Sequence, residues 1–342
     1  MYLGSDLEFE KNIQTAYKFC CRNSYIKDKK IDKIKEILIK NGISNTVINE
    51  IEVDFAFKKF EAVEIKYNNE IVLFPIKKEL EIDSIFDTFI SLGCMIPCHI
   101  QRGSLKEVSN YISNSKNEDK NKLLEHFFRE IYTIEFISEL FIDNYKKMEF
   151  IKNYSEIILE SIKAFCLGLS HIAIMSLIPV IEGIIRDINY DLTKNKTDKI
   201  DKELFLSTIK IILCNYKKSI FNNWSWVPDE FFDNKYLEKF EERVQILISF
   251  EFFIKKHLYE NTDKFSGYGK LNRHGIIHGL FKGYNEEINF FKLLTTLNGL
   301  YFILLIHLNK KGSIWLKTTD DSKNLTSDLN ILKNMKPMIK KM

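Results

Sequence analysis

The segment LLTTLNGLYFILLIHL, residues 293–308, is the most apolar run of the chain. It is shorter than the ~20 residues that a helix needs to cross the hydrocarbon core of a membrane. It also contains Thr295, Asn298 and His307, whose polar side chains disfavour a membrane span. The run therefore predicts a buried helix of a helical bundle, over residues 286–309.

Apolar side chains at helical spacing recur through most of the chain before this run. Clusters of Pro, Gly and Asn separate the periodic segments, as expected where helices end and turns begin. The segments with this pattern are residues 123–147, 154–167, 169–190, 201–217 and 234–260. Together they predict an all-α bundle in the C-terminal two thirds of the chain.

The N-terminal section mixes helical and strand periodicities. Val63, Ile65 and Tyr67 alternate with polar residues. A tight turn can follow at Asn68-Asn69, and an apolar run then leads to Pro75, so this part predicts a β-hairpin. Helical spacing covers residues 7–22, 30–41 and 82–93. The expected fold class is mainly α, with a C-terminal helical bundle and a smaller N-terminal α/β unit that contains the hairpin.

A stretch without any apolar residue, SNSKNEDKNK at residues 113–122, is the best candidate for a linker or long loop. We therefore expect an accessory domain at 1–118, a helical bundle at 119–310 and a basic tail at 311–342. Eight Lys and three Asp from residue 310 onward make that end basic. The accessory domain has no recognisable catalytic motif, so we expect it to serve recognition, regulation or dimer support.

The composition is ordinary for a soluble globular protein, with 45% hydrophobic and 28% charged residues among 342. The net charge of +3 does not indicate an obligate nucleic-acid coat protein or a membrane-surface protein. The six cysteines are scattered, and the first residues lack the features of a signal peptide. We expect a cytoplasmic protein with reduced thiols and no membrane partner. Its many Lys, Ile and Asn residues are typical of an AT-rich bacterial genome.

The segment LNRHGIIHG, residues 271–279, is the candidate active site. Arg273 carries a permanently charged, planar group that suits phosphate oxygens, and His278, five positions later, is of the residue type that moves protons near neutral pH. These two groups suffice for metal-free cleavage of RNA, because the 2′-hydroxyl of the substrate can attack the phosphate. No histidine follows at four to six positions after the other arginines, which are Arg22, Arg102, Arg129, Arg186 and Arg243.

The motif consists of Asn272-Arg273-His274, three further residues and His278-Gly279, and a long apolar helix follows soon after. This arrangement resembles the signature of HEPN domains (higher eukaryotes and prokaryotes nucleotide-binding). That signature is an arginine, a polar residue, a short spacer and a histidine. The resemblance covers about residues 150–310. It implies that Arg273 binds the scissile phosphate, that His278 acts as acid or base, and that His274 fills the polar position.

The resemblance also implies the fold and the biological setting. HEPN domains are helical bundles, and many are metal-independent ribonucleases that act as dimers with both motifs facing one cleft. We therefore expect an endoribonuclease that cleaves RNA as a homodimer and needs no metal and no cofactor. Bacterial anti-phage defence, abortive infection or a toxin–antitoxin system is the expected setting, with an antitoxin or defence-system partner.

Residues on both sides of the motif can support it. Asn272 can cap a short helix that runs to His278, and Gly279 can end that helix. Tyr268 and Lys270 lie in the glycine-containing approach, where they can contact RNA or belong to a solvated loop.

Glu182 is the second supporting candidate, on an otherwise apolar helix. His171 precedes it by eleven residues and so lies on nearly the same helix face. Glu182 can orient Arg273 or a histidine, or it can form an internal ion pair with Arg186 one turn later.

Other interpretations of the motif remain open. His274 and His278, one helical turn apart, can ligate the metal of a hydrolase, although no Glu follows the first histidine as a zincin motif requires. The motif can also belong to a non-catalytic HEPN-type module that binds nucleotides or RNA or dimerises, or to a structural helix. Cys94 and Cys98 have no second cysteine pair at zinc-site spacing, so we expect buried thiols there.

Overall fold

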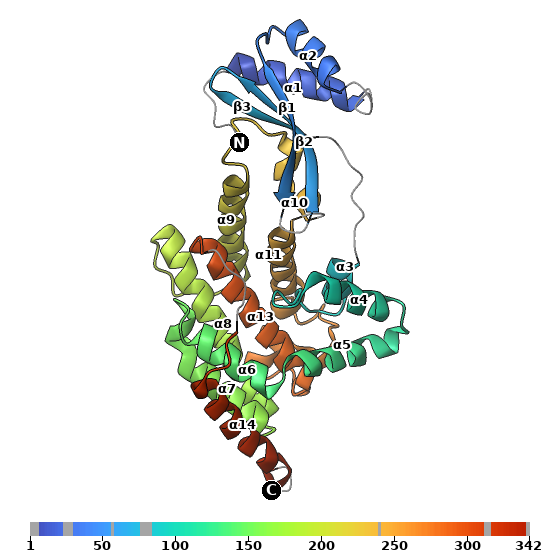
Figure 1. The fold of residues 1–342 in the computed structure, drawn as a ribbon. Coiled ribbons are helices and arrows are strands. Elements are labelled where there is room, and N and C mark those ends of the chain that lie inside the picture. Colours follow the sequence, from blue (N-terminus) through green and yellow to red (C-terminus); the bar gives the residue numbers. More distant parts are fainter. Residues whose placement is uncertain are drawn as a thin grey trace. The chain divides into compact units, whose positions relative to one another are not determined.

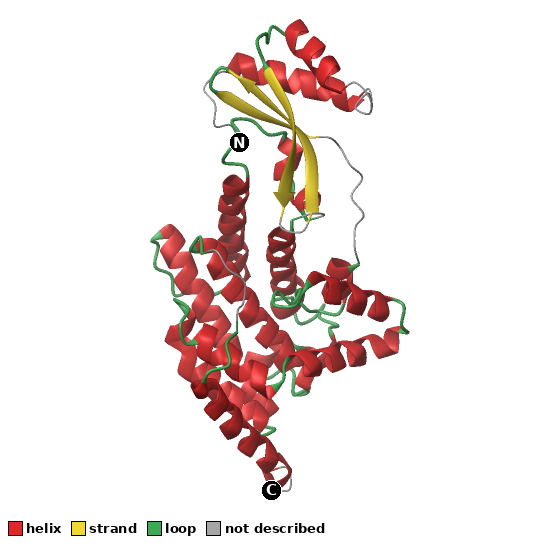
Figure 2. Cartoon of the chain, viewed as in Figure 1, coloured by secondary structure: helices red, strands yellow, loops and turns green. Residues whose placement is uncertain are grey.

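The structure is a computed structural model that describes residues 7–22, 30–55, 58–75, 84–238, 241–310 and 316–339. Helices dominate these residues, and the strands described form one three-stranded antiparallel sheet (Figures 1 and 2). The prediction of a mainly α chain with a small N-terminal α/β unit is confirmed. Two compact units make up the chain, one of residues 1–82 with 214–245 and the other of residues 83–213 with 246–342.

The first unit packs two helices against the sheet. Val63 pairs with Phe74 and Ile65 pairs with Val72 across the strands β2 (Lys58–Tyr67) and β3 (Glu70–Pro75), so these side chains share one face of the sheet. They join apolar residues of α1 and α2 and Trp226 in one buried cluster. The elements are α1 (Leu7–Arg22), α2 (Lys30–Lys40), β1 (Val47–Phe55), β2 (Lys58–Tyr67), β3 (Glu70–Pro75), a 3-10 turn (Asp229–Phe232) and α10 (Asn234–Leu237).

The predicted hairpin is confirmed, with Asn68-Asn69 as its two-residue turn between Tyr67 and Glu70. Asn68 adopts a φ of 52°, a left-handed conformation that asparagine tolerates well. The strand β1 is not among the predicted elements, although its apolar and acidic residues alternate from residue 51 to 55. Residues 214–245 also belong to this unit, whereas the accessory domain expected from the sequence ends at residue 118.

The second unit is an all-helical bundle around α13 (Glu287–His307). Its other elements are α3 (Ile85–Ser91), α4 (Arg102–Ser113), α5 (Asn117–Ile131), α6 (Ile134–Leu140), α7 (Ser155–Cys166), α8 (Ser170–Thr193), α12 (Arg273–Ile277) and α14 (Asp320–Ile339). One π-helical turn, Phe141–Tyr145, follows α6, and a second, Ile254–Leu258, ends just before residue 259. Two 3-10 turns occupy Ile151–Tyr154 and Tyr268–Lys270. The helices α9 (Lys202–Ile220) and α11 (Glu242–Phe253) each contain a point where the chain passes between the units.

The helix α13 is buried on every side, as the sequence predicts for residues 286–309. It is long and apolar enough to cross a membrane, but 89% of its most apolar window is buried inside the structure. Some of its polar side chains form hydrogen bonds within the bundle: Tyr132 and Thr295 share a hydrogen bond of 2.9 Å, and Tyr145 donates to Asn298. The helix is therefore the core of the bundle.

Three expectations about the helices are wrong. The predicted linker at 113–122 is short, because α4 ends at Ser113 and α5 already begins at Asn117. The helix expected at 123–147 is broken where the Thr133 side chain caps α6 by accepting from the Phe136 N–H. The end that was expected to be only a basic tail contains α14, which packs on α6 and α7.

Candidate functional site

The motif forms the short helix that the sequence predicts. Asn272 is its N-cap and accepts a hydrogen bond from the Gly275 N–H at 2.9 Å. The same side chain is fully buried, and its Nδ2 donates to the carbonyls of His257 (3.2 Å) and Glu260 (2.9 Å). His278 is the C-cap. One amide therefore fixes α12 both to its own first turn and to the segment that follows α11.

Arg273 points toward α8 and forms an ion pair there. Its Nε donates to Oε1 of Glu182 at 2.8 Å, and the Glu182 residue is only 6% exposed. The Tyr259 hydroxyl donates to the same carboxylate oxygen, and the guanidinium carbon lies 5.9 Å from the centre of the Tyr259 ring. Of the two interpretations of Glu182, the structure has the one in which it contacts Arg273 and not an ion pair with Arg186.

Only the Nε edge of Arg273 is used by Glu182. The two terminal amino groups have no hydrogen-bond partner among the described residues, and 24% of the side chain is exposed. A guanidinium held in this way presents a planar pair of donors, the geometry that binds phosphate oxygens in bidentate fashion. The arrangement can therefore bind an anion without breaking the contact to Glu182.

The two histidines of the motif lie on the outer side of α12. Both are exposed, and their ring centres are 4.3 Å apart. Five residues at 100° each separate Arg273 from His278 by about 140° around the helix axis. The structure thus brings His274 and His278 together, while Arg273 leaves the same helix on another side.

The approach to the motif is held by a buried amide. Asn289 of α13 donates to the carbonyls of Gly269 (2.6 Å) and Tyr284 (2.9 Å). Gly269 and Lys270 both have positive φ values, 73° and 55°. The side chains of Tyr268 and Lys270 are exposed beside this anchored turn, so both are accessible to a ligand.

Two contacts at the site are not predicted from the sequence. Tyr259 lies fourteen residues before Arg273, and no spacing rule connects a phenol in a loop to a distant carboxylate. Burial and the neighbouring Glu182 raise the pKa of Tyr259, so its hydroxyl remains a donor. His171, expected on the Glu182 face of α8, has its Nε2 3.0 Å from the Lys282 carbonyl and thus contacts the segment after α12.

No group of three or more His, Cys, Asp or Glu side chains gathers as metal ligands in the part of the chain that the structure describes. Cys94 is buried and donates to its neighbour's carbonyl, and Cys98 donates to the Asn298 carbonyl at 3.3 Å. Of the two cysteines expected to be buried, Cys94 is buried and Cys98 is only partly buried, and neither lies in a helix.

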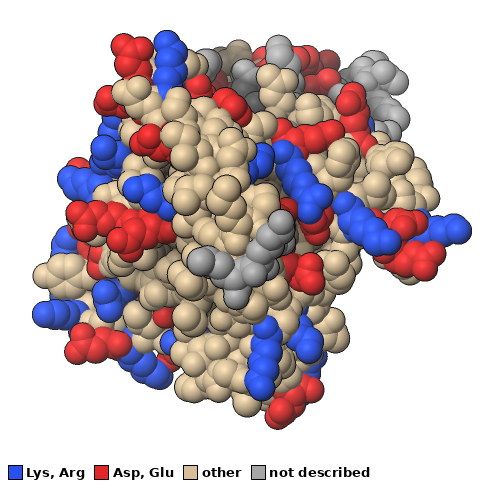
Figure 3. Space-filling view, turned by 90° about the horizontal axis from the view of Figure 1, so that it is seen from below, with Lys and Arg blue, Asp and Glu red and all other residues tan. Residues whose placement is uncertain are grey.

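Charges are mixed on the face of the molecule in Figure 3. Lysine and arginine side chains alternate there with aspartate and glutamate around an uncharged surface, and no large area of one sign is present on that face. This distribution agrees with the small net charge of +3. It favours contacts to a short anionic segment over an extended polyanion track.

Comparison with protein-family models, with curated proteins and with solved structures finds no match to this chain.

Proposed function

We propose that the chain is a metal-independent endoribonuclease of the HEPN type that cleaves RNA by attack of the 2′-hydroxyl. The observation that carries the proposal is the state of Arg273. Its guanidinium is oriented by a buried carboxylate while its terminal amino groups have no hydrogen-bond partner among the described residues, and the same short helix and its C-cap carry two exposed histidines. A phosphate-binding cation and proton-transferring groups on one short helix are the parts this reaction needs.

The reaction uses these groups in a defined order. A histidine takes the proton of the 2′-hydroxyl, the 2′-oxygen forms a bond to phosphorus, and the bond from phosphorus to the 5′-oxygen breaks. A protonated histidine returns a proton to the leaving oxygen. His278 is the principal acid or base, and His274 is its partner. Arg273 binds the non-bridging oxygens, whose negative charge grows in the phosphorane. The products are a 2′,3′-cyclic phosphate and a 5′-hydroxyl.

A second copy of the chain completes the site in this proposal. Exposed apolar side chains flank the histidines, namely Ile277 (43%) and Leu280 (60%), and Ile172 (55%) and Met175 (44%) lie on α8. The helix α12 packs on α8, and the segment that follows α12 contacts the start of α8, where the Tyr284 hydroxyl lies 4.0 Å from the Met175 sulfur. Exposed apolar surface of this kind marks an interaction site. A homodimer through it brings the histidines of one copy toward Arg273 of the other.

The dimer is tested by sedimentation of the purified protein. Leu280→Glu places a charge in the apolar surface, and we expect the wild type to sediment as a dimer and this variant as a monomer. Ile331→Glu is the matched control, because Ile331 is equally exposed (59%) but lies on α14. A monomeric wild type, or a dimer unaffected by Leu280→Glu, contradicts this arrangement.

A non-catalytic nucleotide- or RNA-binding module is the second candidate. The divergence of Arg273 and His278 around α12 favours it, since a single copy does not aim both groups at one phosphate. In that case the protein retains RNA through Arg273 and leaves it intact. A metal-dependent hydrolase that uses His274 and His278 is the third candidate, and a chelator distinguishes it from the proposed enzyme.

The deciding experiment is cleavage of total cellular RNA by the purified protein in EDTA, with the product ends mapped. We expect cyclic phosphate ends from the wild type, a loss of about 100-fold or more for His278→Ala, and a loss of about 100- to 1000-fold for Arg273→Lys. His126→Ala is the matched control and should cleave as the wild type does, because His126 is exposed on α5 and forms an ion pair with Glu130 there. Undiminished cleavage by both motif variants would remove this site from the reaction.

A further inference from the structure

A cavity lies beside the segment that leads into the motif, and all of its lining residues belong to the bundle unit. Its volume is about 440 Å³, and its wall includes Leu92 after α3, Asn121 of α5, His257 and Lys292 of α13. Tyr268 also lines it, but Arg273 and His278 are not among the lining residues. The cavity is therefore adjacent to the proposed active site and distinct from it.

Lys292 is the unusual member of this wall. The residue is 2% exposed, and its Nζ donates to the Leu92 carbonyl at 2.6 Å. The other two N–H groups of the ammonium have no partner within the described ranges, and no described carboxylate forms an ion pair with it. Lysine is almost never fully buried unless it is paired, because removing its charge from water is unfavourable. The site thus contains a cation without its counter-ion.

The neighbours of Lys292 do not neutralise it. Burial, followed by the charge of Lys292, lowers the pKa of His257 to about 4, so this ring is uncharged near neutral pH. Burial raises the pKa of the Cys94 thiol to about 12, so it carries no negative charge either. Glu260 is the carboxylate among the lining residues, and within the described part of the chain it does not contact the ammonium. Burial lowers the pKa of Lys292 itself to about 8.

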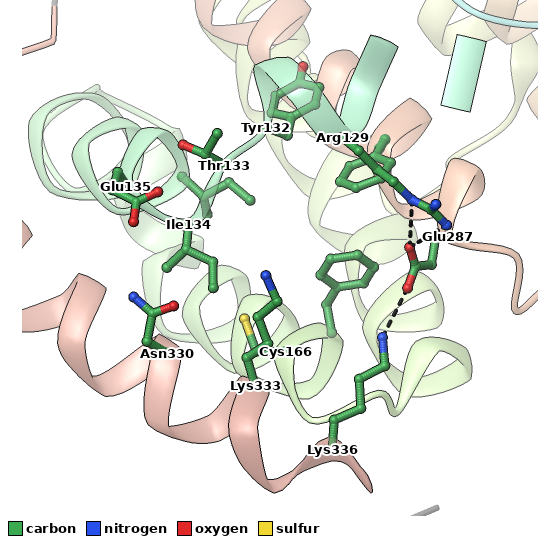
Figure 4. A pocket seen from close by; sticks show the side chains of 13 residues that line it. Arg129, Tyr132, Thr133, Ile134, Glu135, Cys166, Glu287, Asn330, Lys333 and Lys336 are labelled. Atoms are coloured by element: carbon green, nitrogen blue, oxygen red, sulfur yellow. Dashed lines mark hydrogen bonds and ion pairs between the residues drawn. The ribbon is translucent and has the colours of Figure 1, made fainter. Parts of the chain in front are cut away.

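The hollow in Figure 4, of about 510 Å³, shows the opposite situation. It contains Arg129, Lys333 and Lys336, but Glu287 lies between two of them. Arg129 Nε donates to Glu287 at 3.1 Å, and Lys336 Nζ lies 2.9 Å from the other carboxylate oxygen. Two of its three cations are thus paired with a carboxylate inside the protein, whereas the cation of the Lys292 cavity has no described carboxylate partner.

A second unpaired group lines the Lys292 cavity. The Oδ1 atom of Asn121 is buried and accepts no hydrogen bond from any residue that the structure describes. A buried acceptor without a donor is costly, and a ligand that supplies an N–H or O–H group removes that cost. We propose that this cavity binds a small polar ligand whose phosphate or carboxylate group pairs with Lys292 and whose hydroxyl or amino group donates to Asn121. The volume is within the range of cavities that hold small molecules.

Thermal unfolding with and without defined probes tests the proposal. The probes are inorganic phosphate, AMP and citrate, with adenosine as the uncharged counterpart of AMP. We expect an oxyanion probe to raise the melting temperature of the wild type and adenosine to leave it unchanged. A response to phosphate and AMP identifies a phosphate ligand, and a response to citrate alone identifies a carboxylate ligand. Lys292→Met should abolish the response, whereas Lys264→Met, at an exposed loop position, should retain it.

A direct measurement covers the case in which Lys292→Met does not fold. The titration of Lys292 can be followed by NMR in protein with labelled lysine side chains. A bound oxyanion should move its pKa from about 8 back toward 10.5, because the charged form gains its counter-ion. Asn121→Leu should weaken the same shift. The proposal is overturned if no oxyanion probe changes either the melting temperature or the Lys292 titration, or if Lys292→Met responds as the wild type does. Neither readout depends on RNA cleavage.

Discussion

At the scale of single residues, the chemistry of the motif depends on how Arg273 is held. Glu182 is almost completely buried and accepts from both Arg273 and Tyr259. The carboxylate therefore has two donors, while the guanidinium keeps contact with solvent. The loss of stability differs according to which partner of this ion pair is removed. Loss of Arg273 leaves a buried negative charge with one hydroxyl partner, whereas loss of the Glu182 charge leaves a cation that water can reach.

This asymmetry predicts a strong coupling between Arg273 and Glu182. We expect Arg273→Ala to lower the free energy of unfolding by about 2–3 kcal/mol in the wild type, toward the low end for a broken buried pair because Arg273 is partly exposed. In a Glu182→Gln background the same substitution should cost much less, because no buried charge remains. Urea denaturation of the four proteins of this double-mutant cycle measures the coupling. Equal costs in the two backgrounds would show that the ion pair does not contribute.

At the scale of elements, α12 is a five-residue helix whose position depends on one capping side chain. Such a short helix is not stable by itself. Asn272 supplies an acceptor to the first turn and two donors to the carbonyls of His257 and Glu260, all in a fully buried position. The orientation of Arg273 and the two histidines therefore depends on this amide.

Asn272→Asp separates the two roles of the cap. Aspartate keeps the acceptor for the Gly275 N–H but cannot donate to the two carbonyls. We expect Asn272→Ala to lower the free energy of unfolding by about 2–4 kcal/mol, from the lost cap and the unsatisfied carbonyls. Asn272→Asp should be destabilising as well, by an amount that chemical denaturation can measure. If Asn272→Asp were as stable as the wild type, the two donor contacts would contribute nothing.

The elements that the sequence predicts are those with a strong local signal. The cap at Asn272, the end of α12 at His278 and the turn at Asn68-Asn69 all follow from residue types at fixed offsets. The amphipathic α4 and the polar α14 escape prediction, because only a few apolar side chains, such as Leu105 and Leu329, face the core. The helix α14 is stabilised by packing on α6 and α7, far along the chain, whereas α4 packs on the adjacent helices α3 and α5.

Long-range partners are the part of the site that sequence patterns do not contain. Glu182 lies 91 residues before Arg273, and spacing alone leaves its partner open between Arg273, a histidine and Arg186. Tyr259 and Lys292 derive their properties from burial, which depends on the whole bundle. For the same reason, residues 214–245 join the N-terminal unit through contacts such as the bridge between Val72 and Trp226.

At the scale of the whole molecule, the bundle contains two histidines that its interior keeps uncharged. Burial lowers the pKa of His99 to about 3, and that of His257 to about 4. The His99 ring packs against Tyr132 and Phe136 with centres 5.2 and 5.0 Å apart, and its buried Nε2 has no hydrogen-bond partner among the described residues. Both rings become accessible to water when the chain unfolds, and their pKa values then return to about 6.5.

These two groups predict acid sensitivity of the bundle near pH 6. Because the folded pKa values are lower than the unfolded ones, the unfolded chain binds more protons as the pH falls below about 6.5. The contribution of these histidines to stability is therefore fully present above that pH. Below it, the free energy of unfolding decreases by about 1.4 kcal/mol per pH unit for each histidine, until the folded pKa values are reached. His99→Phe keeps the ring packing and removes one of the two groups. Between pH 6 and 5 we expect it to lose about half of this pH dependence, measured by urea denaturation, while His126→Ala on the exposed face of α5 keeps it. An unchanged slope in His99→Phe would mean that His99 is not held neutral by the fold.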